Sequence, residues 1–201
     1  MAIIAKNAGV EIERLEDGVY NAHCVGIIDE GEQFNETFQK AAHKIRLAWQ
    51  IVGETYKNAD GVEVPRMFTK EYNLSLNEKS TLRKDLQSWR NKPFTDEELK
   101  GFDLSNILGK PCQIQLLTKP ERNYQDVVAI MACPKGTVLE APKATFIFDL
   151  TDELTYGNFF GFSQFIQDRI KAATDYAGSA FEAWYNANMP AETEEETDTP
   201  F

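Results

Sequence analysis

The chain has 201 residues, of which 42% are hydrophobic and 26% are charged, a balance typical of a globular protein with one sizeable core. This composition excludes fibrous and largely disordered classes, and no run approaches the roughly 18 apolar residues that would span a bilayer. The formal net charge of -11 at pH 7 argues against a generally basic nucleic-acid binder. Three scattered cysteines without a C-x-x-C pair and a start without a secretory signal lead us to expect a cytoplasmic protein without disulfides or zinc.

Residues 18–28, GVYNAHCVGII, form the first expected strand, in which both faces are largely apolar. Residues 29–40, DEGEQFNETFQK, are polar and are expected to connect this strand to the next one. Two large rings interrupt the polar run, Phe34 and Phe38, and they fit either packing over the end of the fold or clamping a base. The second histidine of the chain has no carboxylate or cysteine beside it at metal-ligand spacing, so no metal site is expected.

The segment 42–74 is the longest run in which apolar and polar residues alternate with a period of two, which predicts a β-hairpin. Asp60-Gly61 supplies the positive backbone angle that a tight hairpin turn needs. In the first arm one face is apolar and the other carries two cations. The apolar positions are Ile45, Leu47, Trp49 and Ile51, and the cations are Lys44 and Arg46.

The returning arm of this hairpin mixes cations and aromatic rings on one face. Arg66, Phe68, Lys70 and Tyr72 stand at alternate positions and therefore point the same way. Such a surface suits a nucleic-acid strand, because phosphates attract cations and bases stack on flat rings. The alternative is that the two rings belong to the core and the cations keep an edge strand soluble. The arm taken alone leaves both interpretations open.

After the hairpin, the apolar spacing changes to that of a helix. Residues 75–78, Ser-Leu-Asn-Glu, have the spacing of a capping box, and Leu82, Leu86 and Trp89 form one apolar stripe on a helix of about four turns. A second capping box at residues 95–98 starts another helical turn, and residues 103–108 are expected to form one more.

Two further strands are expected at residues 112–117 and 124–133, joined by a polar turn that places Lys119, Arg122 and Tyr124 at or beside it. The order is then three strands, a helix and two strands, in a chain that is mainly β with helices. This is the order of an OB-fold, a five-stranded Greek-key barrel whose second and third strands and adjoining loops bind oligonucleotides.

A helical extension is expected after the barrel. Residues 145–150 can add a strand, and a helix is indicated by an apolar stripe that we assign to packing, made of Phe162, Phe165, Ile166 and Ile170. The expected organisation is one domain over residues 1–189, the barrel with its C-terminal helical extension, followed by a tail over residues 190–201.

The tail, PAETEEETDTPF, is acidic and too polar to bury itself, so we expect it to be disordered. It ends in Pro200-Phe201, which places an aromatic ring beside the terminal carboxylate. A small apolar pocket with a basic rim on another protein could capture that ending, with the acids upstream adding attraction.

This ending resembles the acidic tip of bacterial and phage single-stranded DNA-binding proteins, which close in aspartates followed by Phe or Pro-Phe. The stretch from Met67 to Leu116, MFTKEYNL through PCQIQL, is similar to small phage proteins of the same class. The resemblance implies an OB-fold that coats single-stranded DNA during replication and recombination in the host cytoplasm. It also implies recruitment of replication proteins, such as a polymerase, helicase or primase, through Asp198, Pro200 and Phe201.

We therefore expect a binding protein without catalysis or cofactor. The residues expected to contact phosphates are Lys44, Arg46, Arg66, Lys70, Lys119 and Arg122, and those expected to stack on bases are Phe68, Tyr72 and Tyr124. The rival from another class is an acidic interaction protein or DNA mimic, whose negative surface occupies a partner's nucleic-acid site; a metal-dependent nuclease is the enzyme alternative. The sequence leaves open the oligomeric state, the number of nucleotides covered and the preference for DNA or RNA.

Overall fold

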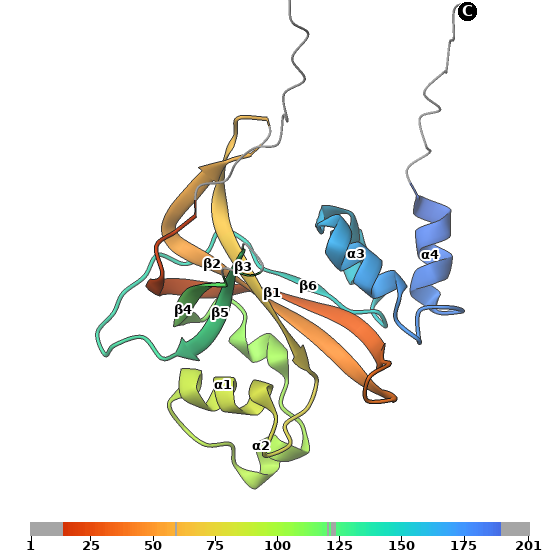
Figure 1. Cartoon of the computed structure of the whole chain (residues 1–201), viewed down its shortest axis with the longest axis horizontal. Coiled ribbons are helices and arrows are strands. Elements are labelled where there is room, and N and C mark those ends of the chain that lie inside the picture. Colours follow the sequence, from red (N-terminus) through yellow and green to blue (C-terminus); the bar gives the residue numbers. More distant parts are fainter. Residues whose placement is uncertain (1–13, 59, 120, 122–123, 190–201) are drawn as a thin grey trace, which may run out of the picture.

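The computed structural model describes residues 14–189 apart from 59, 120, 122 and 123. Its elements are strands, α-helices and two 3-10 helices labelled η (Figure 1). In chain order they are β1 (Gly18–Asn35), β2 (Lys40–Lys57), β3 (Glu63–Asn73), α1 (Thr81–Arg90), α2 (Asp96–Lys100), η1 (Leu104–Ile107), β4 (Pro111–Lys119), β5 (Tyr124–Met131), β6 (Phe146–Phe148), η2 (Glu153–Gly161), α3 (Gln164–Lys171) and α4 (Ala180–Asn188).

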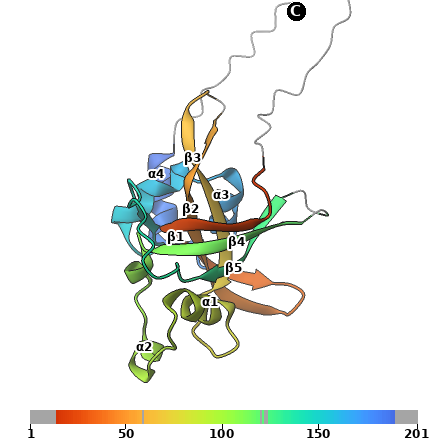
Figure 2. The same cartoon turned by 90° about the vertical axis from the view of Figure 1, so that its left-hand side faces the viewer.

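The strands form one six-stranded sheet in the order β3-β2-β1-β4-β5, with β6 paired to β1 outside this path. The neighbours along the path are antiparallel, whereas β6 runs parallel to β1. The end strands β3 and β5 contact each other, but within the described residues no hydrogen-bonded ladder joins them. The expectation of a mainly β chain with helices is confirmed. The sheet is curled, so that β1 and β4 cross in front of β2 and β3 in Figure 2.

The hairpin predicted over residues 42–74 is confirmed as β2 and β3, with Gly61 at a positive φ of 75° in the turn. The apolar stripe of β2 is buried as expected, and Trp49 and Leu47 lie opposite Phe68 and Lys70 of β3. The first strand is longer than expected. Residues 29–35 continue β1 because they pair with the start of β2, although they carry no apolar alternation that would signal a strand.

The main core lies between the inner face of the curled sheet and α1. Leu82, Leu86 and Trp89 are buried there, which confirms the predicted apolar stripe, although α1 has 10 residues and is shorter than the four turns expected. The capping box expected at residues 75–78 is wrong, because α1 begins only at Thr81 and the Ser75 hydroxyl instead accepts a hydrogen bond from the Asn77 backbone N–H in a turn. The box at residues 95–98 is confirmed at the start of α2.

A second core, here called the aromatic core, joins the outer face of β1 to residues 146–188, here called the C-terminal extension. Adjacent β1 residues point to opposite faces, so Ile27 packs into the main core and Ile28 into the aromatic core. Phe181 packs edge to face on Phe148 and on Phe159, and the rings of Phe148 and Phe159 are tilted against each other. The added strand expected at residues 145–150 is present as β6, and α3 covers most of the expected helix, whereas the sequence pattern missed η2 and α4.

Close contact between β1 and the helical part of the C-terminal extension occurs at Gly31. This residue has a positive φ of 69°, and a Cβ built on it would lie 2.7 Å from the Cβ of Ala173 and 2.6 Å from Oδ1 of Asp175. Gly61 has a similar φ of 75°, but no atom lies within 4 Å of its added Cβ. Substitutions at the two glycines therefore distinguish the cost of backbone strain from the cost of steric overlap.

We expect Gly61→Ala to lower the free energy of unfolding by about 1 kcal/mol, the cost of a left-handed backbone at alanine. Gly31→Ala should lower it by about 3 kcal/mol, because overlap with the extension adds to the same backbone cost. Urea denaturation of both variants beside the unaltered chain measures the difference. Equal losses in the two variants would contradict close packing of the extension on β1.

Candidate nucleic-acid interface

Two adjoining hollows lie where β3 faces β5, and together they are called the β3–β5 groove. The first has a volume of about 560 Å³ and extends toward the turn between β2 and β3. The second has a volume of about 790 Å³ and extends toward α3. Both are lined by Met67, Phe68, Tyr124 and Gln125. These four shared residues make the hollows one continuous surface.

Phe68 and Tyr124 bring two of the expected stacking rings together in this groove. Phe68 is half-buried on the inner face of β3 and packs at the edge of the main core, and Tyr124 opens β5 with 43% of its surface exposed. Arg66 also lines the first hollow, with its guanidinium carbon 5.7 Å from the centre of the Tyr56 ring. One expected cation and two expected rings thus line a single cavity.

Tyr72 does not belong to that surface, so its expected stacking role is wrong. Only 3% of the residue is exposed, and its hydroxyl donates a hydrogen bond of 2.8 Å to Oδ2 of Asp85 on α1. Burial, together with the negative charge of Asp85, raises the pKa of the Tyr72 hydroxyl far above its usual range. Helix α1 covers this end of β3 and seals the ring inside the main core.

Lys70 points to the same face and lines the second hollow, but a carboxylate already neutralises its charge. Its Nζ lies 2.8 Å from Oδ2 of Asp85 and 5.3 Å from the centre of the Tyr72 ring. A phosphate in the groove would have to compete with Asp85 for this ammonium group. A phosphate that approached Lys119 would likewise have to compete with Asp126 of β5, which forms an ion pair with this lysine.

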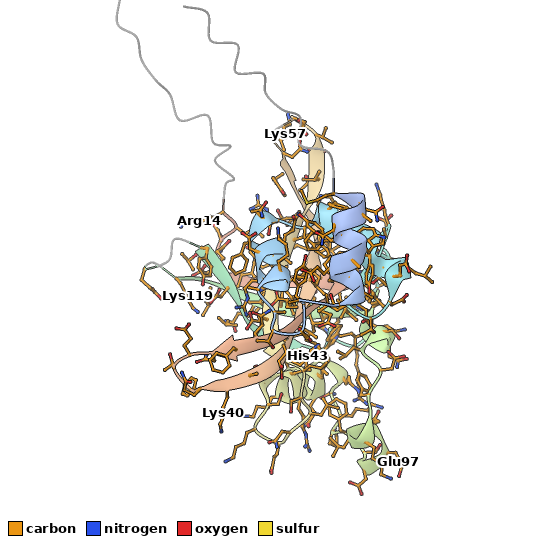
Figure 3. All side chains as sticks on the ribbon, turned by 90° about the vertical axis from the view of Figure 1, so that its right-hand side faces the viewer. Arg14, Lys40, His43, Lys57, Glu97 and Lys119 are labelled. Carbon is orange, nitrogen blue, oxygen red and sulfur yellow. The ribbon has the colours of Figure 1, made fainter. Side chains whose placement is uncertain are left out.

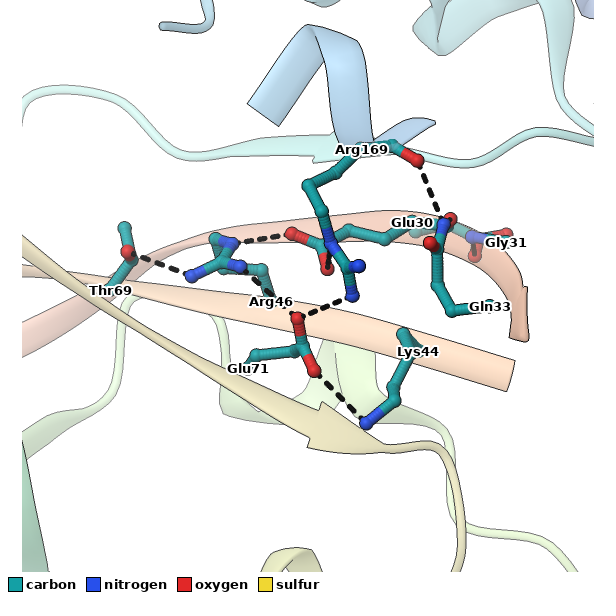
Figure 4. A network of polar contacts seen from close by, with 9 residues as sticks. Glu30, Gly31, Gln33, Lys44, Arg46, Thr69, Glu71 and Arg169 are labelled. Atoms are coloured by element: carbon teal, nitrogen blue, oxygen red, sulfur yellow. Dashed lines mark hydrogen bonds and ion pairs between the residues drawn. The ribbon is translucent and has the colours of Figure 1, made fainter. Parts of the chain in front are cut away.

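Lys44 and Arg46 lie on the opposite face of β2, where they join a network of ion pairs (Figure 4). Nε of Arg46 donates to Oε1 of Glu30, a side chain with no exposed surface, and a second Arg46 nitrogen lies 3.5 Å from Oε2 of Glu71. Nζ of Lys44 lies 3.0 Å from Oε1 of Glu71. The expectation that Arg46 holds a phosphate in the binding groove is therefore revised: its charge stabilises a buried carboxylate, although one edge of the side chain lines the second hollow.

Arg169 of α3 completes this network, with one nitrogen 2.8 Å from Oε2 of Glu71 and Nε 3.9 Å from Oε2 of Glu30. Burial raises the pKa of Glu30, and the nearby Arg46 opposes that rise. The pKa of Glu71 is also raised by burial, but the hydrogen bond and charge of Lys44, with the charges of Arg169 and Arg46, outweigh burial and lower it overall. The network ties α3 to three strands of the sheet.

The remaining expected site residues are Lys119, Arg122 and the three tail residues. Arg122 and the tail residues Asp198, Pro200 and Phe201 lie outside the described residues. Lys119 ends β4 beside the groove, whereas Glu97 in the acidic first turn of α2 lies at the opposite extremity of the molecule (Figure 3).

The groove contains two rings that the sequence did not assign to it, Tyr56 and Phe165. Tyr56 could have been found from its place near the turn of the predicted hairpin. The helical spacing around Phe165 instead suggested a core position, yet this residue is 62% exposed.

Comparison with protein-family models, curated proteins and solved structures finds no match to this chain. In the described part of the chain, no group of three or more histidine, cysteine, aspartate or glutamate side chains is placed to hold a metal ion. No helix among those residues has the length and apolar run needed to cross a membrane.

The free energies of unfolding of two alanine variants can separate the roles of Lys44 and Arg46. We expect Arg46→Ala to lower the free energy of unfolding by about 3 kcal/mol, because it leaves the carboxylate of Glu30 buried without its main partner. Lys44→Ala should cost less than about 1 kcal/mol, since Glu71 is partly exposed and keeps Arg169. Urea denaturation provides the comparison.

A double variant, Glu30→Gln with Arg46→Met, is the control for this prediction. It should recover much of the stability lost in Arg46→Ala, because no unpaired buried charge remains. Equal stability of Arg46→Ala and the unaltered chain would instead mean that Glu30 does not depend on Arg46.

Proposed function

We propose that this chain binds single-stranded DNA in the β3–β5 groove, with little sequence preference and without catalysis. The observation that carries the proposal is the meeting of Phe68, Tyr124 and Arg66 in one open groove. Aromatic rings stack on the flat face of any base, and a guanidinium group can bind the phosphates or stack in turn. Bases in a duplex already stack on one another, so this groove favours an unpaired strand.

The chain topology supports the same proposal, and we infer an OB-fold-like barrel formed by β1 to β5. The neighbours along the sheet, the helix α1 between β3 and β4, and the contact between β3 and β5 match the order of that fold. OB-folds bind oligonucleotides on the second and third strands and the adjoining loops, which is where β3 and Tyr124 contribute to the groove. Under this proposal β6 and the C-terminal extension are additions to the barrel.

The charges around the groove limit what phosphates can contribute. Lys70 and Lys119 are each paired with a carboxylate, and Arg46 is held by Glu30. A phosphate that approaches them must replace an existing partner, so its net gain is smaller than that of a contact with an unpaired cation. Stacking should therefore supply most of the affinity.

The cellular role that we propose is that of a phage-type protein that coats and protects single-stranded DNA in replication and recombination. The support is the sequence alone: in residues 190–201 a run of acids is followed by Pro200-Phe201, as in the family that the chain resembles. Replication proteins would be recruited through Asp198, Pro200 and Phe201 by an apolar pocket with a basic rim.

Fluorescence anisotropy of a labelled oligo-dT tests the proposal directly. We expect saturable binding at low salt and at least about tenfold weaker binding of a duplex of the same length. The logarithm of affinity should fall only gently with that of salt concentration, with a slope of about 1 to 2, because each phosphate neutralised on a single strand adds roughly 0.7. Absence of binding at low salt would overturn the proposal and favour an acidic protein that mimics DNA.

Ring substitutions locate the binding surface. We expect Phe68→Leu, which keeps apolar volume in the core, and Tyr124→Ala to weaken binding by about 1–3 kcal/mol each through loss of base stacking. Phe160→Leu is the control, because this ring packs on Trp184 and Tyr185 of the C-terminal extension. Titration of all three variants with the same oligonucleotide gives the comparison, and equal affinities throughout would place the binding surface elsewhere.

A further inference from the structure

One ring of α3 stands apart from the rest of its apolar stripe. Ile166 and Ile170 pack into the aromatic core, whereas Phe165 is 62% exposed and lines the second hollow of the groove together with Phe68 and Tyr124. A ring this exposed contributes little to folding, since most of its apolar surface stays in water. Its placement therefore indicates contact with a ligand in the groove rather than packing in the core.

Despite its exposure, the ring of Phe165 contacts the ion network. The guanidinium carbon of Arg46 lies 5.6 Å from its centre, within the range of a cation–π contact. Arg169 follows Phe165 by four residues, which places both on one side of α3, and it binds Glu71 of β3 at 2.8 Å. The ion network thus fixes the helix that carries the ring, so little ordering is left for a ligand to impose.

The groove also leads to this ring. Its second hollow is lined by Phe68 and Lys70 from the inner face of β3 and by Thr69 and Glu71 from the outer face. Alternate residues of a strand point to opposite faces, so a hollow that contains both sets passes over the free edge of β3. A strand lying on Phe68 and Tyr124 would therefore continue over this edge toward α3.

The charge beside Phe165 suits that path. The network contains three cations, Lys44, Arg46 and Arg169, and two carboxylates, Glu30 and Glu71, which leaves one net positive charge. A phosphate flanking a base on Phe165 would meet this local excess rather than the negative charge of the chain as a whole.

We propose that Phe165 is a stacking platform for a base of the bound single strand, so that the C-terminal extension supplies an outer subsite of the binding groove. This inference rests on the proposed function, because it extends the same groove. It assigns to α3 a ligand contact besides its packing role, and it lengthens the expected path of the strand beyond the barrel.

The test is titration of Phe165→Ala with labelled oligo-dT of 4 and of about 12 nucleotides. A short oligonucleotide can be bound by Phe68 and Tyr124 alone, and a longer one is needed to reach the outer subsite. We expect at least about fivefold weaker binding of the longer oligonucleotide, the lower limit for loss of one stacked base, and little change for the shorter one. Leu154→Ala, which truncates a 95% exposed apolar side chain of the same extension, should bind both as the unaltered chain does.

Phe165→Trp provides a second readout that does not depend on affinity. Its indole should stack as well as the native ring and lose fluorescence as the longer oligonucleotide saturates the protein. Of the native tryptophans, Trp49 and Trp89 are buried and Trp184 packs against the aromatic core, and the unaltered chain titrated in parallel gives their background signal. If the unaltered chain binds, but Phe165→Ala binds each length as tightly as the unaltered chain does and Phe165→Trp shows no quenching, the outer subsite is wrong and the proposed function stands. If the unaltered chain binds neither oligonucleotide, both proposals fail.

Discussion

A single buried carboxylate constrains the arrangement of this molecule. Glu30 has no exposed side-chain surface, and an ionised group in that position is stable only with cations held against it. Arg46 supplies one from β2, and Arg169 supplies another from α3. Arg46 is the main partner of this carboxylate, and Arg169 joins it to Glu71 of β3, so the network holds the C-terminal extension against the sheet in this orientation. The position of Phe165 at the end of the groove follows from that orientation.

The contacts of β3 explain why this strand carries the groove. Its outer face meets α3 through Glu71, and its inner face packs on the main core, but the contact with β5 lacks a hydrogen-bonded ladder within the described residues. Free edges invite pairing with other chains, and proteins protect them with charge and proline. Arg66, Lys70 and Pro65 meet that description on β3. The mixed surface thus fits protection of an edge as well as binding, and only the meeting of Phe68 with Tyr124 distinguishes the two.

Local patterns in the sequence predicted the hairpin of β2 and β3, the stripe of α1 and the later strands, because each depends on neighbours a few residues away. They could not predict the fate of Tyr72 or Arg46. Alternation shows which residues share a face but not which end of that face α1 covers, so Tyr72 looked equivalent to Phe68. The partners of Arg46 stand 16 and 25 residues away, and Arg169 stands 98 residues from Glu71. Phe165 has the spacing of a core residue, and only the packed structure shows its exposure.

An acidic protein can bind a polyanion if the energy comes from contacts other than charge. Stacking on Phe68, Tyr124 and Phe165 does not require a net positive surface, and salt screens it far less than it screens a phosphate contact. Under the proposed function, the carboxylates paired with Lys70 and Lys119 would favour single strands over duplexes. A duplex hides the flat faces of its bases and would have to bind mainly through phosphates, for which these cations are already neutralised, whereas an unpaired strand offers base faces that the acids do not repel. Selectivity for single strands would thus come from the acids of the groove as much as from its rings.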